Sequence, residues 1–254
     1  MNRRGVERQE RLLQALVSGG SLHLADAAKL CGVSEMTLRR DVSSRDSLLS
    51  LMGGYLVRRD DPHYMPTYDL SAQQMRGAEI KASLCRHALS CIDDGDTLFI
   101  DCGTTLLPLA SELGRRQGLT VVTYALNVAN AVSALDDVRL ILLGGRYRRV
   151  SQSFEGDDMA AQIRALGINR AFISAAGVHP QRGLSCFHFH EVAPKQAVIE
   201  TAAQRILVFD DSKWDCLRPA FFGALSDVDI IVTHDRAASA LADIPDLIPR
   251  LITM

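Results

Sequence analysis

The chain has 254 residues, 47% of them hydrophobic and 23% charged, with a formal net charge of −2 at neutral pH, as is usual for a globular protein. No apolar run approaches the roughly 20 residues of a membrane span, and residues 1–20 are charged and lack a signal-peptide core, so no membrane partner is expected. Six scattered cysteines without a C-x-x-C pair favour reduced thiols in a cytoplasm over a disulfide framework.

A helix-turn-helix is predicted near the N-terminus. A short helix from Leu24 to Leu30 is followed by Gly32, which supplies the positive φ of a tight turn. Ser34 then has the side chain of an N-cap for a second helix. Such a second helix enters the major groove of DNA. We expect the following residues of the cap and helix to face double-stranded operator DNA: Ser34, Glu35, Met36, Thr37, Arg39 and Arg40.

Helix pairs of this kind also occur in proteins that bind no DNA, and paired arginines are often only a solvated face. The charge distribution favours DNA. Residues 1–59 hold ten Lys or Arg against six Asp or Glu, whereas the remainder holds eighteen against twenty-four. A basic head on an acidic body is expected when one end meets phosphates, which Arg3, Arg4, Arg8 and Arg11 could contact. Because such motifs usually read paired half-sites, a homo-oligomer is expected.

Two apolar runs around Gly53 and Gly54, over residues 48–57, predict a β-hairpin that would form a wing beside the helices. Charge and proline then replace the apolar pattern, which indicates a linker. The predicted organisation is a DNA-binding domain over 1–57, a linker over 58–71 and an effector domain over 72–254.

The effector domain is predicted to be an α/β layer structure. A helix is expected over 72–92, with Ile80, Leu84, Ala88 and Cys91 on its buried stripe. Strands and helices then alternate, which implies a mostly parallel sheet covered on both faces. The expected strands are 97–100, 119–123, 139–143, 170–174, 206–209 and 230–232, and the expected helices are 106–113, 128–135 and 192–204.

Ligands of such sheets bind where strands end and helices begin, and four loops there carry polar residues. In the first, Gly103 lets the backbone approach a ligand, while Thr104 and Thr105 offer hydroxyls and N–H groups to an anion such as phosphate. A plain capped helix start would have the same residues. The second loop is Gly144-Gly145, which would also serve as an ordinary turn.

The third loop contains Gly177, followed by Glu191 and Lys195, which would share a face of a helix. They would form either an exposed ion pair or a cation and a hydroxyl acceptor for a sugar. The fourth loop places Lys213 among small polar residues after a strand, which suits a phosphate and also a salt-bridged surface loop.

Cys186, His188 and His190 would share one face if their segment were a strand, and they are a plausible partial zinc set. No fourth ligand is evident at a suitable spacing. We therefore predict no metal site, and no cofactor is implied. The histidines could instead donate hydrogen bonds in a pocket wall.

The segment from Val33 to Val42 resembles the V-S-x-x-T-[IL]-R-R-D signature of the DeoR family of bacterial transcriptional regulators. The D-x-G-T-T, Gly-Gly, A-x-G, E-x-x-x-K and D-S-K motifs are similar to the effector domain of that family. The resemblance implies a fold like that of ribose-5-phosphate isomerase and a site that senses a phosphorylated sugar. It nominates Asp101, Gly103, Thr104, Thr105, Gly177, Glu191, Lys195 and Lys213, with Asn127 as a further candidate.

Longer stretches, among them Phe99 to Thr105 and Ser174 to His179, go beyond the general pattern and resemble one particular member of the family. They imply deoxyribose-5-phosphate as inducer and genes of deoxyribonucleoside catabolism as targets.

Two functions stay open at this stage. The first is a repressor that leaves DNA when its body binds a sugar phosphate. The second is a sugar-phosphate isomerase-like enzyme, with Asp101 or Glu191 as general base and Lys195 stabilising an enediolate. The N-terminal head has no use in an isomerase, so the expected function is that of a repressor and not of an enzyme.

Overall fold

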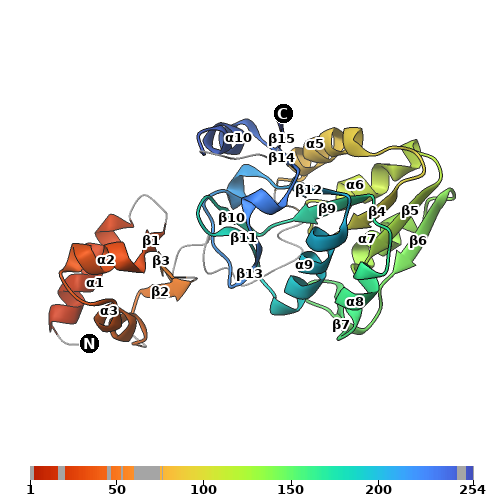
Figure 1. The fold of residues 1–254 in the computed structure, drawn as a ribbon. Helices are drawn as coiled ribbons and strands as arrows, with labels where there is room; N and C mark the ends of the chain where they lie inside the picture. Colours follow the sequence, from red (N-terminus) through yellow and green to blue (C-terminus); the bar gives the residue numbers. More distant parts are fainter. Residues whose placement is uncertain are drawn as a thin grey trace.

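The computed structural model describes residues 3–16, 21–44, 47–52, 54–59, 75, 77–244 and 250–253. A small N-terminal head stands beside a larger C-terminal body (Figure 1). Among the described helices, none is long and apolar enough to cross a membrane.

Over its described residues the head contains three helices and a small antiparallel sheet in the order β1-β3-β2. Its elements are α1 (Arg3–Ala15), β1 (Leu22–His23), α2 (Leu24–Cys31), α3 (Glu35–Val42), β2 (Leu49–Met52) and β3 (Tyr55–Arg58). Gly32 ends α2 with φ 63°, and the Ser34 side chain accepts a hydrogen bond from the Thr37 N–H, so both predicted turn signals are confirmed. Leu12, Leu24 and Leu38 form the core of the head.

The body is built on a seven-stranded sheet in the order β15-β14-β12-β9-β4-β5-β6, in which every pair is parallel. From β4 the chain winds one way to β5 and β6, and from β9 it winds the other way to β12, β14 and β15. The strand order therefore reverses between β4 and β9, where sheets of this kind form a crevice at their carboxyl edge. The strands are β4 (Thr97–Ile100), β5 (Leu119–Thr123), β6 (Val138–Leu142), β9 (Arg170–Ser174), β12 (Gln204–Val208), β14 (Ile230–Thr233) and β15 (Arg250–Thr253).

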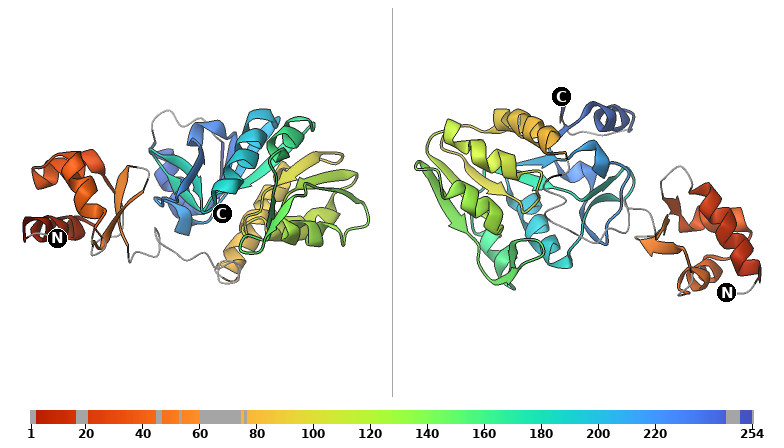
Figure 2. Two further views of the ribbon diagram at one scale, coloured as in Figure 1. Left: turned by 90° about the horizontal axis from the view of Figure 1, so that it is seen from below. Right: turned by 180° about the vertical axis from the view of Figure 1, so that it is seen from behind.

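Helices cover both faces of this sheet, with α5, α6 and α7 together on one face and α8 packed on α9 on the other (Figures 1 and 2). The α-helices of the body are α5 (Ala78–Ala88), α6 (Leu107–Glu112), α7 (Leu126–Val132), α8 (Met159–Arg164), α9 (Val192–Thr201) and α10 (Asp235–Ala242). Short 3-10 turns are η1 (Leu89–Cys91), η2 (Leu113–Arg115), η3 (Phe189–Glu191), η4 (Asp211–Lys213) and η5 (Leu225–Asp227).

In the described part of the body, five further strands lie outside the main sheet. β7 (Arg146–Arg148) and β8 (Ser153–Glu155) form a hairpin after β6. β10 (Gly177–His179), β11 (Gly183–Cys186) and β13 (Ala220–Gly223) form an antiparallel sheet on the side of the body nearest the head (Figure 1). The sequence did not predict these strands, because each has only three or four residues and too few apolar positions to show a period.

The six predicted parallel strands are confirmed, with bounds shifted by at most two residues. The predicted linker over 58–71 lies outside the described residues except for Arg58 and Arg59. The predicted helix over 72–92 corresponds to α5 and η1, and its residues 72–74 and 76 are likewise not described. The domain boundaries stay predictions.

The buried stripe of α5 differs from the expected one. Lys81, Leu84, Cys85 and Ala88 are buried, whereas Ile80 is 40% exposed, so its predicted place in the core is wrong. Leu84 and Ala88 belong to both stripes, and only packing against the body decided whether Ile80 or Lys81 would complete the buried face.

Leu38→Ala tests the head core, because Leu38 is fully buried between the helices. Removing its side chain leaves a cavity, and we expect the head to lose about 2–5 kcal/mol of unfolding free energy. Met36→Ala, two residues earlier on the exposed face, serves as the matched control and should change stability by less than about 0.5 kcal/mol. Urea unfolding followed by circular dichroism measures both, and equal losses would contradict this packing.

Candidate functional site

Helix α3 presents a polar face to solvent. Glu35, Met36, Arg39 and Arg40 are exposed and Thr37 is partly exposed, as the sequence predicted for a helix that reads DNA. The Ser34 hydroxyl lies 3.0 Å from that of Thr37, so both take part in the start of the helix. This face is therefore open to a partner, while the opposite face is held by Leu38 in the core.

Arg8 forms an ion pair between two helices of the head. Its Nε and guanidinium NH2 donate to Asp41 Oδ2 at 2.9 and 2.6 Å, and both side chains are only 16% exposed. The pair fastens α3 to α1, and the phosphate contact expected of Arg8 stays a prediction. Long-range pairing of this kind leaves no trace in local sequence.

In the body, a buried ion pair lies where the strand order reverses. Asp101 follows β4 and has no exposed surface, and Lys195 of α9 is also buried and donates to Asp101 Oδ2. Ser174, at the end of β9, donates to the same oxygen through its N–H (3.0 Å) and its hydroxyl (2.6 Å). Tyr124 donates to the other carboxylate oxygen at 2.7 Å. Both carboxylate oxygens of Asp101 thus accept hydrogen bonds, so Asp101 orients Lys195 and is not placed to act as a general base.

The ion pair keeps both groups charged. Burial alone would raise the pKa of Asp101, but the charge of Lys195 and the three side-chain donors outweigh it and hold that pKa below its usual range. Burial would likewise lower the pKa of Lys195, and the Asp101 carboxylate outweighs it and raises the pKa. A fixed ammonium group therefore stands beside the crevice at the carboxyl edge of the sheet.

A small cavity of about 50 Å³ lies next to this pair. Its walls come from the loop after β4, the end of β9, the end of β11, the start of α9 and η4. Six of the predicted site residues line it: Gly103, Thr104, Thr105, Glu191, Lys195 and Lys213. At Gly103 a Cβ would stand 2.0 Å from Ser174 Oγ, so the close approach of this loop to β9 requires glycine.

Lys81 was missed by the sequence analysis. It is 2% exposed, and its Nζ donates to Thr104 Oγ1 at 3.1 Å, so it supports the cavity wall from α5. The chain has four lysines, and three of them, Lys81, Lys195 and Lys213, are buried around this one cavity. Lys195 is paired with Asp101, so Lys81 and Lys213 are the lysines that add positive charge around the cavity.

Glu191 is buried in the wall of the cavity. Its burial raises its pKa to about 7, with Lys195 opposing that shift, Asp101 adding to it, and the thiols of Cys102 and Cys186 hydrogen-bonding to its carboxyl group. Glu191 is the N-cap residue of α9 with helical backbone angles, and Glu191 and Lys195 both face this cavity, as expected for residues four apart on a helix. The alternative of an exposed ion pair is wrong, because both side chains are buried and Lys195 pairs with Asp101. Near neutral pH, Glu191 can donate or accept a hydrogen bond.

Five predicted residues do not line the cavity: Asp101, which is buried in its ion pair with Lys195, and Asn127, Gly144, Gly145 and Gly177. Asn127 begins α7, where its Oδ1 accepts from the Val128 N–H. Gly144 and Gly145 follow β6, and a Cβ at Gly145 would stand 2.3 Å from the Glu155 carbonyl oxygen. Gly177 lies in β10, where a Cβ would stand 2.6 Å from the Cys216 carbonyl oxygen. At Gly145 and Gly177, close backbone packing accounts for the glycine.

The segment from Cys186 to His190 is not one strand, so the condition under which its cysteine and histidines would share a face is not met. β11 ends at Cys186, whose thiol lies 3.5 Å from the Ala220 carbonyl oxygen, and His190 lies in η3 beside Ser151 and Ser153. The three side chains do not gather around one point. Among the described residues, no group of three or more His, Cys, Asp or Glu could hold a metal ion.

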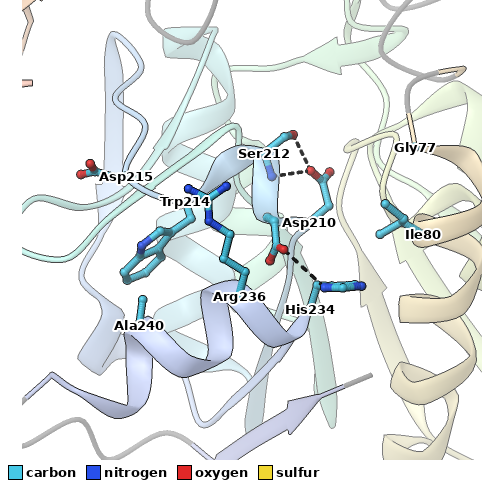
Figure 3. Close-up of a pocket in the computed structure, with 10 residues that line it drawn as sticks. Gly77, Ile80, Asp210, Ser212, Trp214, Asp215, His234, Arg236 and Ala240 are labelled. Atoms are coloured by element: carbon cyan, nitrogen blue, oxygen red, sulfur yellow. Dashed lines mark hydrogen bonds and ion pairs between the residues drawn. The ribbon is translucent and has the colours of Figure 1, made fainter. Parts of the chain in front are cut away.

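A larger cavity of about 730 Å³ opens beside the first, past the ends of β12 and β14 (Figure 3). Trp214, Asp215 and Arg236 line it together with polar groups that have partners of their own. Asp210 accepts from Ser212, and Asp211 accepts from the Ala237 N–H at the start of α10 and lies 3.3 Å from His234 Nδ1. The loop after β12 thus contributes to both cavities, because Lys213 lines the small one and its neighbours line the large one.

Glu191→Gln tests the buried carboxyl group. Because folding raises the pKa of Glu191 from 4.5 to about 7, the protonated carboxyl group stabilises the folded state. This contribution to the unfolding free energy is complete below pH 4.5 and is lost as the pH rises through about 7. Glutamine does not titrate, so the variant should not lose this contribution at high pH. The difference in unfolding free energy between variant and wild type should therefore be about 2 kcal/mol larger at pH 8 than at pH 5.5, because one pKa unit corresponds to about 1.4 kcal/mol. Urea unfolding at both pH values measures it, with Glu200→Gln on exposed α9 surface as control. A gain independent of pH would contradict the buried environment.

Comparisons with known proteins agree with this two-part structure. Residues 8–50 match the DeoR-like helix-turn-helix domain, and residues 76–235 match the DeoR C terminal sensor domain. The chain is 36% identical over 233 residues to the deoxyribose operon repressor of Escherichia coli K12, covering 92% of each chain. It is 29% identical over 210 residues to the HTH-type transcriptional regulator IolR of Bacillus subtilis, covering 82% of each.

Ribose 5-phosphate isomerase A from Neisseria gonorrhoeae is a more distant structural neighbour, with a TM-score of 0.40 and 13% identity over 56% of this chain and 54% of that one. Two domain matches and a relative aligned along nearly the whole chain decide the family. The protein belongs to the DeoR family and is a transcriptional repressor with a helix-turn-helix head and a sensor body, not an enzyme.

Proposed function

We propose that this repressor controls genes of deoxyribose and deoxyribonucleoside catabolism and leaves its operator when the body binds deoxyribose-5-phosphate. It would act in the cytoplasm as a homo-oligomer whose paired heads read two half-sites. The observation that carries the sugar-phosphate part is the burial of three of the four lysines around one cavity of the body.

The phosphate would bind at the wall formed by the loop after β4 and by η4. Lys213 supplies a cation there, and Thr104 and Thr105 supply hydroxyl and N–H donors. Lys81 donates to Thr104 and adds positive charge behind the loop. Charge-assisted hydrogen bonds to a phosphate are about twice as strong as neutral ones, which would give the ligand its affinity.

The sugar would bind at the wall that holds Glu191. The carboxyl group can accept from or donate to a hydroxyl, while Cys102 and Cys186 present sulfur atoms, which bond weakly to hydroxyl groups. A wall with one strong polar group between two thiols suits a sugar that lacks a hydroxyl. The name of the Escherichia coli relative, deoxyribose operon repressor, supports the same choice.

The size of the cavity adds a condition. A single water needs at least about 10–15 Å³ measured this way, so about 50 Å³ holds only a few waters. A pentose phosphate has many more heavy atoms than those few water molecules. Binding would therefore have to widen the cavity, and the change in shape would carry the signal to the head.

The first experiment measures binding of the purified protein to a deoxyribonucleoside-operon promoter fragment during titration with deoxyribose-5-phosphate. Release should occur with deoxyribose-5-phosphate but not with ribose-5-phosphate or free deoxyribose. Lys213→Met should bind the fragment normally and need at least about tenfold more sugar phosphate for release, since a charged hydrogen bond is lost. Arg115→Met, which removes an exposed charge of the body, is the matched control.

Tight DNA binding unaffected by any of the three sugars would keep the repressor and remove the proposed inducer. A normal response of Lys213→Met would contradict the assigned phosphate site.

Arg39→Ala and Arg40→Ala test the reading of DNA by α3. Both side chains are exposed on the helix, so their loss should weaken operator binding by about 1–3 kcal/mol and leave sugar binding and stability unchanged. Fluorescence anisotropy of labelled operator at several salt concentrations measures the loss and separates base from phosphate contacts. Arg139→Ala on the outer strand β6 is the control, and an equal loss there would remove the role of α3.

A further inference from the structure

The head and body share an apolar contact. Met52 of β2 and Tyr55 and Val57 of β3 pack with Leu217 of the body, and Phe221 of β13 lies against the same cluster. Val57 and Leu217 have no exposed surface. The wing strands therefore have a seat on the body, formed by the β10-β11-β13 sheet and the chain that enters β13 (Figures 1 and 2).

Polar contacts fix the orientation of this seat. The Tyr55 hydroxyl donates to Gln181 Oε1 at 2.7 Å, and its ring lies 4.8 Å from the ring of His179. Nδ1 of His179 accepts from the N–H groups of Gln181 and Arg182, so Nε2 carries the proton and faces Ser21 of the head at 3.4 Å. Aromatic packing and directed hydrogen bonds together specify one docked position.

The segment Lys213–Leu217 connects this seat to the small cavity. Lys213 lines the cavity, and Leu217, four residues later, is buried against the wing. Between them Asp215 has φ 53°, a conformation that few residues other than glycine adopt, and the Cys216 carbonyl lies against Gly177. The segment is short and constrained, so Lys213 cannot move far without moving Leu217.

The other walls of the cavity are held more firmly. The loop after β4 and the end of β9 are fixed by the Asp101 network, and Lys195 anchors the start of α9 to the same carboxylate. Widening by a ligand would therefore act on the side of Lys213 and of Phe187, which also lines the cavity.

We propose that the wing docks on the β10-β11-β13 sheet through Tyr55 and Val57, and that the segment Lys213–Leu217 couples sugar-phosphate binding to release of this contact. The coupling rests on the proposed function of the cavity. A ligand that needs the widened cavity binds the undocked state more tightly, so it shifts the chain toward that state. By reciprocity, weakening the docking contact must raise the affinity for the ligand.

Tyr55→Phe and Gln181→Ala remove the same hydrogen bond from its two sides. Each should raise the affinity for deoxyribose-5-phosphate by about 3- to 10-fold, the range expected for one hydrogen bond, and the double variant should add little more. Tyr147→Phe on β7, which removes a hydroxyl from an exposed tyrosine, is the matched control and should leave the affinity unchanged. Calorimetry measures the affinities.

The segment itself can be followed by fluorescence, because Trp214 is the one tryptophan of the chain. Its emission should change during titration of the wild type with deoxyribose-5-phosphate. Without sugar, Tyr55→Phe and Gln181→Ala should also bind operator several-fold more weakly than the wild type, since they favour the undocked state.

The outcomes separate the two proposals. If the wild type binds the sugar phosphate, and Tyr55→Phe and Gln181→Ala bind it and the operator as the wild type does, the coupling is overturned and the ligand site remains. If the wild type binds no sugar phosphate, the proposed function fails and the coupling to it fails as well. Weaker operator binding by both variants would then show only that docking supports DNA binding.

Discussion

The ion pair of Asp101 and Lys195 holds three parts of the body in register: the end of β4, the end of β9 and the start of α9. Both groups lie away from water, and removing either partner would leave an uncompensated buried charge at a cost of about 3–5 kcal/mol. A buried pair contributes little net stability compared with apolar packing. Its effect here is geometric, since it fixes the crevice at which the two windings of the sheet meet.

The groups around that crevice form two walls of different chemical character. Lys81, Lys213 and the threonine hydroxyls give one wall a positive character, and Glu191 between two thiols gives the other a single titrating group. The ring of Phe222 lies 4.9 Å below the Lys195 ammonium group and shields the pair from solvent on the side of β13. The same β13 sheet is the seat of the wing, so one structural unit borders both the cavity and the head.

Local patterns were sufficient where the responsible interactions are local. Ser34 caps α3 through Thr37, three residues away, and Gly32 ends α2 with its own φ, so the helix-turn-helix was predictable residue by residue. The six parallel strands were predictable because each is a compact apolar run. The site was predictable in part: the loop from Gly103 to Thr105, Glu191, Lys195 and Lys213 line the cavity, whereas Asn127, Gly144, Gly145 and Gly177 do not.

The sequence by itself determined the helix-turn-helix, the alternation of strands and helices, and the polar loops at strand ends, because caps, turns and hydrophobic periods act between residues close in the chain. Only the tertiary structure decided that Lys81 and not Ile80 faces inward, that Arg8 pairs with Asp41 and that Lys195 pairs with Asp101 across 94 residues. The packing of Tyr55 and Val57 against Leu217 was likewise decided only by the tertiary structure. Burial of these groups depends on which segments pack together, and a partner distant in sequence leaves no periodic or local signal to read.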